Sequence, residues 1–505
     1  MKQFIIYVSL FLFVCCPLEM SSKVNLQHAE KLIDRMPKED PWIRNPYGAT
    51  FAWGESYTLG AFMDLYEATK DTKYLEIVAD RGKRMLTHRD DKCGVRDGSG
   101  KSRPAWSEAR KYVVAVGALL STTGEEMLTI RSATSSSNNY TTIKVVRSKK
   151  SDKFTLTVRN DERKRYETFN NLDLNFSPSS IMNAINDPLA PYSCRSGNYT
   201  DQGSHLIRIE EVKTEVSGVL ANQEISLTPI PLAFAGYLGV IYYPLMRFCE
   251  IVKEDPLLNR FISDADEFIK AAEESYADIS ARLWREGPNS GEGYYLMCEK
   301  GESMPADNVG APFNYLAKHV CTELALYKLT DKPQYLERAT KMLNLFYNRL
   351  TYNEENDLYT WKYWYEPMTT TGWLPEDSIS FNAKSFPRAA PVEDISHAGH
   401  NIQMIMAAYR AGVVFNETHV KRFANTFIKN VLTPDRKKIT QLVDGSGDNQ
   451  AYFNAIHQWL ALAEVNPEVF KAGKEIYENR TEETLPWTAA LLKYENYLDK
   501  KPGAR

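Results

Sequence analysis

The chain has 505 residues, of which 43% are hydrophobic and 25% charged, a composition typical of globular proteins with a large core. At about 150 residues per domain the length would give about three domains, although helical toroids run longer as one unit. With 61 basic and 65 acidic residues the net charge is −4, which argues against a nucleic-acid partner held by bulk electrostatics.

The N-terminus has the pattern of a signal peptide: Lys2, an apolar run from Phe4 to Val14, and then Pro17. This run is shorter than a bilayer span, and no later segment has about 18 uninterrupted apolar residues. We therefore expect residues 1–20 to be a signal peptide. The mature protein would then be secreted, or lie in the lumen of the secretory pathway, without a transmembrane segment. A signal anchor is the alternative.

Sequons and cysteines bear on the same expectation. The N-x-[ST] sequons, which are candidate glycosylation sites, lie at Asn139, Asn175, Asn198, Asn416 and Asn479. Beyond the expected signal peptide the cysteines are Cys93, Cys194, Cys249, Cys298 and Cys321. In an oxidising compartment they allow two disulfide bonds and leave one thiol free. There is no CxxC spacing, so we expect no structural zinc.

An internal repeat predicts the fold. LYEATKDTKYLE at Leu65–Glu76 recurs as LYKLTDKPQYLE at Leu326–Glu337, and weaker copies begin at Phe248, Ala407 and His457. Each copy predicts a hairpin of two helices joined by a short polar turn. Helical hairpins that recur along a chain indicate a solenoid or a closed toroid, and their irregular spacing with long loops favours the toroid. We expect a mainly α fold, an (α/α) toroid or incomplete barrel, over residues 25–499.

Residues 125–226 break the helical pattern. Stretches such as MLTIRSATSSSNNYTTIKVVRS and KFTLTVRND alternate in polarity and are rich in β-branched residues. We expect a β-rich or irregular insertion within the helical body, with a poorly ordered expansion as the alternative.

The densest group of reactive side chains lies in Ser385–Gln403, which includes Arg388, Glu393, Asp394, His397 and His400. The segment reads as a loop leading into a helix, where Asp394 can cap the helix and both carboxylates suit its positive end. His397 and His400 are three residues apart and share one helix face. Three interpretations stay open: a cap beside a packed histidine, a divalent metal site, and a catalytic or substrate-contacting site. We expect no metal.

Two further stretches could line a groove. Pro305–His319 places Asn314 at the start of a repeat helix, where its amide can bind a substrate carboxylate or simply cap the helix. LYTWKYWYEP at Leu358–Pro367 forms an aromatic strip that contains Trp361, Tyr363 and Tyr365. The strip can stack on sugar rings or serve helix–helix packing. Trp53, Glu55 and Trp106 lie in shorter segments that could face the same groove.

The PFN helix start, the W-x-Y-W strip and the E-D-x-S-H-A helix start resemble secreted polysaccharide lyases with an (α/α) toroid, which act on uronate polymers such as alginate or glucuronan. The resemblance covers the helical body and not residues 125–226. It implies β-elimination on an acidic polysaccharide, with no cofactor. It also implies three roles: carboxylate neutralisers (Asn314, Arg388), a base (His397 or His400) and an acid (Tyr363 or Tyr365). These groups would converge on one groove at the rim of the toroid.

Other functions remain open. A glycoside hydrolase would need two carboxylates about 5–9 Å apart, and Glu55, Asp307, Glu393 and Asp394 are available. A uronyl epimerase begins with the same proton abstraction as a lyase. A non-catalytic glycan-binding protein would keep the aromatic side chains, but it would need neither acid nor base.

Overall fold

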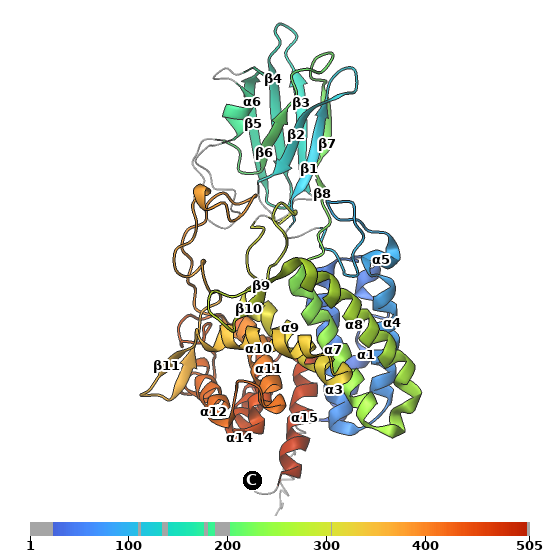
Figure 1. Ribbon diagram of the computed structural model, residues 1–505, viewed down its shortest axis with the longest axis vertical. Helices are drawn as coiled ribbons and strands as arrows, with labels where there is room; N and C mark the ends of the chain where they lie inside the picture. Colours follow the sequence, from blue (N-terminus) through green and yellow to red (C-terminus); the bar gives the residue numbers. More distant parts are fainter. Residues whose placement is uncertain are drawn as a thin grey trace, which may run out of the picture.

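The computed structural model describes residues 24–109, 113–133, 140–175, 180–186, 203–304 and 306–501. A helical body carries a smaller β-sandwich at one end (Figure 1). The expected signal peptide, Asn139, Asn198 and Cys194 lie outside the described residues. In the described part of the chain, no helix combines the length and the apolar character that a membrane span requires.

Six helices of the described residues form an inner ring. They are α3 (Ser56–Thr69), α7 (Ala235–Glu254), α9 (Phe313–Thr330), α11 (Ile395–Ala411), α13 (Ile456–Trp459, continued by the 3-10 helix η8, Leu460–Glu464) and α15 (Leu485–Lys500). Each packs against the next in this order, and α15 packs against α3, so that the contacts close on themselves.

A second helix lies outside each inner one. The pairs are α3 with α4 (Lys73–Thr87), α7 with α8 (Ile262–Leu283), α9 with α10 (Pro333–Tyr347), α11 with α12 (Glu417–Thr426), η8 with α14 (Pro467–Glu478), and α15 with α1 (Leu26–Asp34). The helical body therefore has two layers. Most of its apolar core lies between them and between neighbouring inner helices.

The repeated sequence forms the same turn twice, as predicted. Helix α3 ends at Lys70 and α9 at Asp331, both with positive φ (61° and 55°). Their N–H groups donate to the carbonyls of Tyr66 and Tyr327, which closes the last helical turn. Thr69 and Thr330 each donate a hydroxyl to the carbonyl four residues earlier, at 2.7 Å. The helical hairpins predicted from the sequence are thus confirmed at these two turns.

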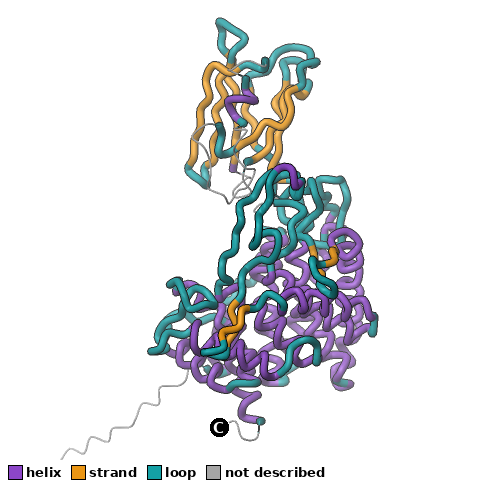
Figure 2. Tube along the Cα trace, turned by 60° about the vertical axis from the view of Figure 1, so that its left-hand side comes forward, coloured by secondary structure: helices purple, strands orange, loops and turns teal. Residues whose placement is uncertain are grey.

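The remaining elements of the helical body lie in its connections. They are η1 (Pro41–Ile43), α2 (Gly48–Thr50), the π-helix η2 (Phe51–Glu55), α5 (Asp90–Cys93), η4 (Pro256–Phe261), β9 (Trp284–Glu286), β10 (Gly293–Tyr295), β11 (Thr351–Asn353), β12 (Leu358–Thr360), η5 (Pro375–Asp377), the π-helix η6 (Phe427–Val431) and η7 (Gln450–Ala455). Most inner helices are preceded by a long connection and followed by a short turn. Many of the loops run between the helices and the sandwich (Figure 2).

The sandwich consists of two four-stranded antiparallel sheets, in the orders β6-β2-β1-β8 and β5-β4-β3-β7. Its elements are β1 (Ala115–Leu120), β2 (Glu126–Ser132), β3 (Thr141–Arg147), β4 (Phe154–Asn160), β5 (Arg165–Leu172), α6 (Ile181–Ile185), β6 (Ile207–Val212), β7 (Gln223–Ser226) and β8 (Thr228–Pro229). Phe154, Leu156 and Val158 of β4 point inward, as the alternation requires, into a core separate from that of the helices.

Strands β1 and β8 lie outside the stretch 125–226 that the sequence marked as β-rich. The β1 sequence, AVGALL, contains neither alternating polarity nor several β-branched residues, so it could not be distinguished from a helix by its pattern. These two strands pair with each other, Ala115 opposite Pro229, at the base of the insertion.

The two disulfide bonds that the cysteine count allowed are not formed. Cys93, Cys249, Cys298 and Cys321 are all free thiols, and two bonds would have required at least three of them. Three of the four are buried at different places in the core, where they pack as small apolar side chains. Cys249, for example, lies on α7 and donates to the carbonyl of Ala265.

Candidate active site

Residues 361–363 form an extended segment, in which Trp361 packs against the helix residues Phe346 and Phe423. Lys362 and Val392 form an antiparallel bridge. The Glu393 N–H donates to the Trp361 carbonyl (3.1 Å), and the Tyr363 N–H to that of Pro391 (3.0 Å). The aromatic strip therefore runs alongside the residues that lead into α11. The Phe313 N–H donates to the Tyr363 carbonyl (3.3 Å), which brings the start of α9 to the same place.

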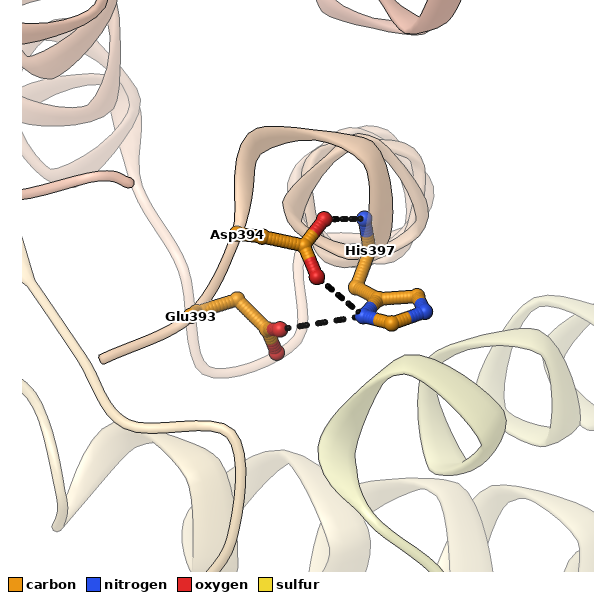
Figure 3. Close-up of side chains that lie close together, drawn as sticks. All are labelled: Glu393, Asp394 and His397. Carbon is orange, nitrogen blue, oxygen red and sulfur yellow. Dashed lines mark hydrogen bonds and ion pairs between the residues drawn. The ribbon is translucent and has the colours of Figure 1, made fainter. Parts of the chain in front are cut away.

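Asp394 caps α11 and holds His397. One carboxylate oxygen accepts from the N–H groups of Ser396 (2.9 Å) and His397 (3.1 Å). The other lies 2.6 Å from His397 Nδ1, and Glu393 Oε1 lies 3.6 Å from the same nitrogen (Figure 3). The Nε2 of His397 faces away from both carboxylates (Figure 3). The ring of Tyr363 lies 5.1 Å from the imidazole, centroid to centroid.

The charges of these three groups depend on one another. Burial alone would lower the pKa of His397, but the carboxylates of Asp394 and Glu393 outweigh it and raise that pKa to about 10. Burial raises the pKa of Glu393 to about 7. Burial also acts to raise the pKa of Asp394, yet the bond to His397 outweighs it and lowers that pKa. At neutral pH His397 is therefore a cation held by an ionised Asp394.

The side chains of this cluster differ in how exposed they are to solvent. The side chain of His397 is 38% exposed, that of Asp394 15%, and that of Glu393 is fully buried. Tyr363 is half-buried. A substrate can therefore reach His397 and Tyr363, while Glu393 and Asp394 support the imidazole from behind.

The same three side chains are a possible cation site. One ligand atom each from Glu393, Asp394 and His397 lies within 4.8 Å of the others. A divalent cation bound there would have to displace the proton of His397, whose raised pKa opposes binding at neutral pH.

His400 belongs to a different environment. It is buried one turn further along α11, with Nε2 3.1 Å from the Tyr57 hydroxyl and its ring 5.8 Å from that of Trp53. Burial holds its pKa well below the usual value, so the ring is neutral. It is absent from the cluster of possible metal ligands found in the described residues. A metal site shared by the two histidines, one interpretation of their spacing, is thus not supported.

Several predicted site residues, the candidate acid Tyr365 among them, are enclosed by the protein. The Tyr365 hydroxyl donates to the Ala311 carbonyl (3.0 Å), and the indole N–H groups of Trp361 and Trp106 donate to Asn401 Oδ1 and the Met85 carbonyl (each 3.0 Å). Glu55 accepts two hydrogen bonds from Arg81 (2.5 and 2.6 Å). All four side chains are buried, so they hold the fold together and cannot touch a substrate in this conformation.

The structure brings some of the residues that were predicted to converge close to one another. His397 and Tyr363 are in contact, and Asn314 lies on the neighbouring helix start. Asn314 is only 1% exposed, however, and its Oδ1 accepts no hydrogen bond. Arg388 is exposed, and its Nε donates to the Thr369 carbonyl (3.0 Å) within the loop. Trp53 is half-buried.

Sequence reasoning missed the aromatic cluster below the site. The ring of Trp53 packs against Tyr315 (5.7 Å) and Tyr237 (6.1 Å) as well as His400. Tyr237, Tyr315 and His400 come from three inner helices and Trp53 from η2, and their spacing within each helix does not differ from that of core residues. No local sequence pattern could have identified the cluster.

Comparisons with known proteins found no matching family model and no matching curated protein. Solved structures match in part. A cellobiose 2-epimerase from Bacillus thermoamylovorans is 14% identical with a TM-score of 0.32, over 53% of this chain and 61% of that chain. A family 76 glycoside hydrolase from a bovine Bacteroides thetaiotaomicron strain is 12% identical with a TM-score of 0.33, over 53% of this chain and 56% of that chain. An inactive variant of an alpha-1,6-mannanase of a Salegentibacter species, in complex with alpha-1,6-mannotriose, is 10% identical with a TM-score of 0.34. The match covers 52% of this chain and 75% of that chain. Scores this low do not establish a shared topology, and the description of the ring rests on its own helix contacts.

Proposed function

We propose that the chain is a carbohydrate-active enzyme built on an (α/α) toroid, with its acid–base centre at His397 and Tyr363. The closed order of inner helices and the outer helix paired with each support the toroid. The centre lies where long connections lead into α9 and α11, and such loops are the usual carriers of function on a rigid scaffold.

We favour β-elimination on a uronate polymer, and the contact between His397 and Tyr363 carries this assignment. The reaction needs one group to take the C5 proton of the uronate and another to give a proton to the departing O4. An imidazole and a phenol side by side supply such a pair. A protonated His397 also attracts an anionic substrate, because its Nε2 faces away from the carboxylates that hold it.

The raised pKa of His397 reverses the roles that the sequence resemblance implied. An imidazole that is protonated at neutral pH acts as the acid and donates from Nε2 to the leaving oxygen. Tyr363, whose ring lies against that of His397, then takes the C5 proton. Asp394 orients the imidazole through Nδ1.

Glycoside hydrolysis is the second candidate, since one observation favours it. Glu393 and Asp394 are neighbouring carboxyl groups whose pKa values are shifted in opposite directions, a pattern that assigns one as acid and the other as base. Against it, Glu393 is fully buried and would have to rotate outward to reach a glycosidic bond.

Export and glycosylation are part of the proposal. The expected signal peptide supports them, and the sequons at Asn175, Asn416 and Asn479 are on exposed residues.

The test is to incubate the full chain with alginate, glucuronan and glycosaminoglycans. An unsaturated uronate that absorbs in the ultraviolet indicates β-elimination, and new reducing ends without that absorbance indicate hydrolysis. We expect His397→Ala to lower turnover by roughly 10²–10⁴-fold, the usual contribution of an acid–base group, while the fold is kept. His28→Gln is the matched control, because His28 also contacts a carboxylate (Glu483, 3.1 Å) but lies on α1.

Unchanged activity in a folded His397→Ala protein would exclude the proposed centre. Binding of the polymers without any cleavage would instead favour a non-catalytic glycan-binding protein.

A further inference from the structure

A large cavity opens inside the ring at the end opposite His397. Its volume is about 1140 Å³, and the C-terminal halves of all six inner helices contribute to its lining. A smaller cavity of about 50 Å³ continues from it toward His400 and shares Asp64, Tyr243, Arg247, Gln403 and His457 with it. Together they form a space that reaches from the surface into the middle of the ring. The large cavity is slightly above the roughly 300–1,000 Å³ of typical small-molecule sites, so it has room for a small molecule.

Most of the charged side chains around the large cavity are already paired. Arg247 and Lys493 both contact Asp64 and Glu67, at 2.6 to 3.2 Å. Arg410 pairs with Glu464, and Lys328 with Glu250 and Glu254. These side chains make the entrance polar, but they leave little net charge to select a ligand.

Lys318 is the exception at the deep end. It lies on α9 and is 5% exposed; its Nζ donates to Gln403 Oε1 and lies 4.6 Å from the centre of the Tyr243 ring. No carboxylate of the described residues forms an ion pair with it. A buried cation without a paired anion is unfavourable, because Gln403 and the Tyr243 ring replace its lost hydration only in part. Burial accordingly lowers the pKa of Lys318 to about 8, which still leaves it mostly charged at neutral pH.

Hydrogen-bonding groups surround this lysine. Tyr57, His400 and His457 line the small cavity together with Lys318 and Gln403. His400 Nδ1 is buried and has no hydrogen-bond partner, while Nε2 is engaged with Tyr57. If the Tyr57 hydroxyl donates to Nε2, the imidazole proton resides on Nδ1, which is then a free donor. One unpaired cation and unused donors at the end of a cavity match the needs of an oxyanion.

We infer that this cavity binds a small acidic molecule whose carboxylate or phosphate group pairs with Lys318, while the rest of the molecule occupies the larger space. The ligand enters from the face opposite His397. The site is independent of the proposed catalytic function, because it uses a different cation and a different opening.

The experiment measures thermal unfolding of the full chain at constant ionic strength with sodium phosphate, sodium glucuronate or glucose. We expect phosphate, glucuronate or both to raise the unfolding midpoint in a saturable way, since a ligand that binds only the folded state stabilises it. A shift with phosphate alone indicates a phosphate ligand, and a shift with glucuronate alone indicates a carboxylate ligand. Glucose, which lacks the acid group, should have no effect.

Two variants on α9 separate the site from general electrostatics. Lys318→Met should weaken binding of the active anion by about tenfold or more, the loss expected for one charge-assisted hydrogen bond. Without ligand, Lys318→Met should be at least as stable as the wild type, because an unpaired buried charge has been removed. Lys328→Met is the control: Lys328 also lines the cavity, but it is 56% exposed and ion-paired. The affinity of the Lys328→Met protein for the active anion should stay within about twofold of that of the wild type.

Three results would overturn the inference. They are the absence of a saturable shift with either anion, an equal shift in Lys318→Met, and a Lys318→Met protein that is less stable than the wild type without ligand. The readout is binding, so a failure here is distinct from a failure of the proposed lyase activity.

Discussion

The two ends of the helical ring use the same helices in different ways. At one end, long connections enter α9 and α11, and His397 is exposed beside Tyr363. At the other end the turns are short, and charged side chains of the helices themselves line a cavity. Helix N-termini favour anions and C-termini favour cations, which suits Asp394 at the first end and Arg410 at the second. In our proposals the chemistry takes place at the loop-bearing end, and the ligand binds between the helix faces at the other end.

The sharpest test of the first assignment compares two tyrosines two residues apart. Tyr363→Phe should lower turnover by roughly 10²–10⁴-fold, because the phenol is a proton-transfer group in the proposed reaction. Tyr365→Phe should leave turnover unchanged and lower the free energy of unfolding by about 1 kcal/mol, since it loses only its buried bond to Ala311. Steady-state kinetics and urea unfolding measure the two effects. Equal kinetic losses in both variants would remove Tyr363 from the chemistry.

Glu55 tests whether the loop-bearing end holds a second reactive carboxylate. Glu55→Gln should lower the free energy of unfolding by about 3 kcal/mol, because it breaks a buried ion pair with Arg81. The turnover of the folded protein should not change. Glu39→Gln is the control, since its pair with Arg44 is exposed and should contribute under about 1 kcal/mol. A large kinetic loss in folded Glu55→Gln protein would instead make this residue part of the active site.

The sequons of the helical body test whether exposed asparagines of this chain are glycosylated. In a secretory host, Asn416→Gln and Asn479→Gln should each remove one glycan, seen as a gel shift. Asn416→Gln should also lower stability by about 1 kcal/mol, because Asn416 caps α12 by accepting from the His419 N–H. Thr418→Ala removes the same sequon and keeps the cap, so it should shift mobility with little loss of stability. Protein from that host without any shift would refute glycosylation.

The smallest expected effect concerns pH. The folded-state pKa of His397 is raised to about 10, so its ion pair stabilises the protein fully below about pH 6.5 and is lost as the pH rises through about 10. The stability advantage of the wild type over His397→Gln should therefore shrink across this window. We expect a change of about 0.5 kcal/mol, because the side chain is 38% exposed and screened by solvent. Urea unfolding at several pH values measures it, and a constant difference would contradict the ion pair.

The hairpins could be predicted because their turns are local. Asp255 and Asn466 cap their helices from just before a proline, and Gly412 ends α11 with a positive φ, all within a few residues of sequence. The closure of the ring could not be read in this way. It depends on α15 packing against α3, between segments more than 400 residues apart in the chain, for which the sequence has no local pattern.

The site divides in a similar way. The sequence identified Asp394 as a cap, and the bond to the His397 N–H confirms it. It could not separate Tyr363 from Tyr365, because the partner that buries Tyr365 is Ala311, over fifty residues away. The sequence analysis did not identify Lys318, because a lysine in a helix normally indicates a solvent-facing position. In this protein α9 is enclosed on both sides by α7 and α11.

The contact between α15 and α3 has a consequence for biosynthesis. Lys493 pairs with Asp64 and Glu67, and Asn496 donates to the Ala68 carbonyl, so one wall of the ring is built from the first and last inner helices to be translated. Until α15 leaves the ribosome, the faces of α3 and α13 that it covers have no partner. A nascent chain in this state is a natural chaperone client, and a ribosome stalled late in the message would release a product prone to aggregation.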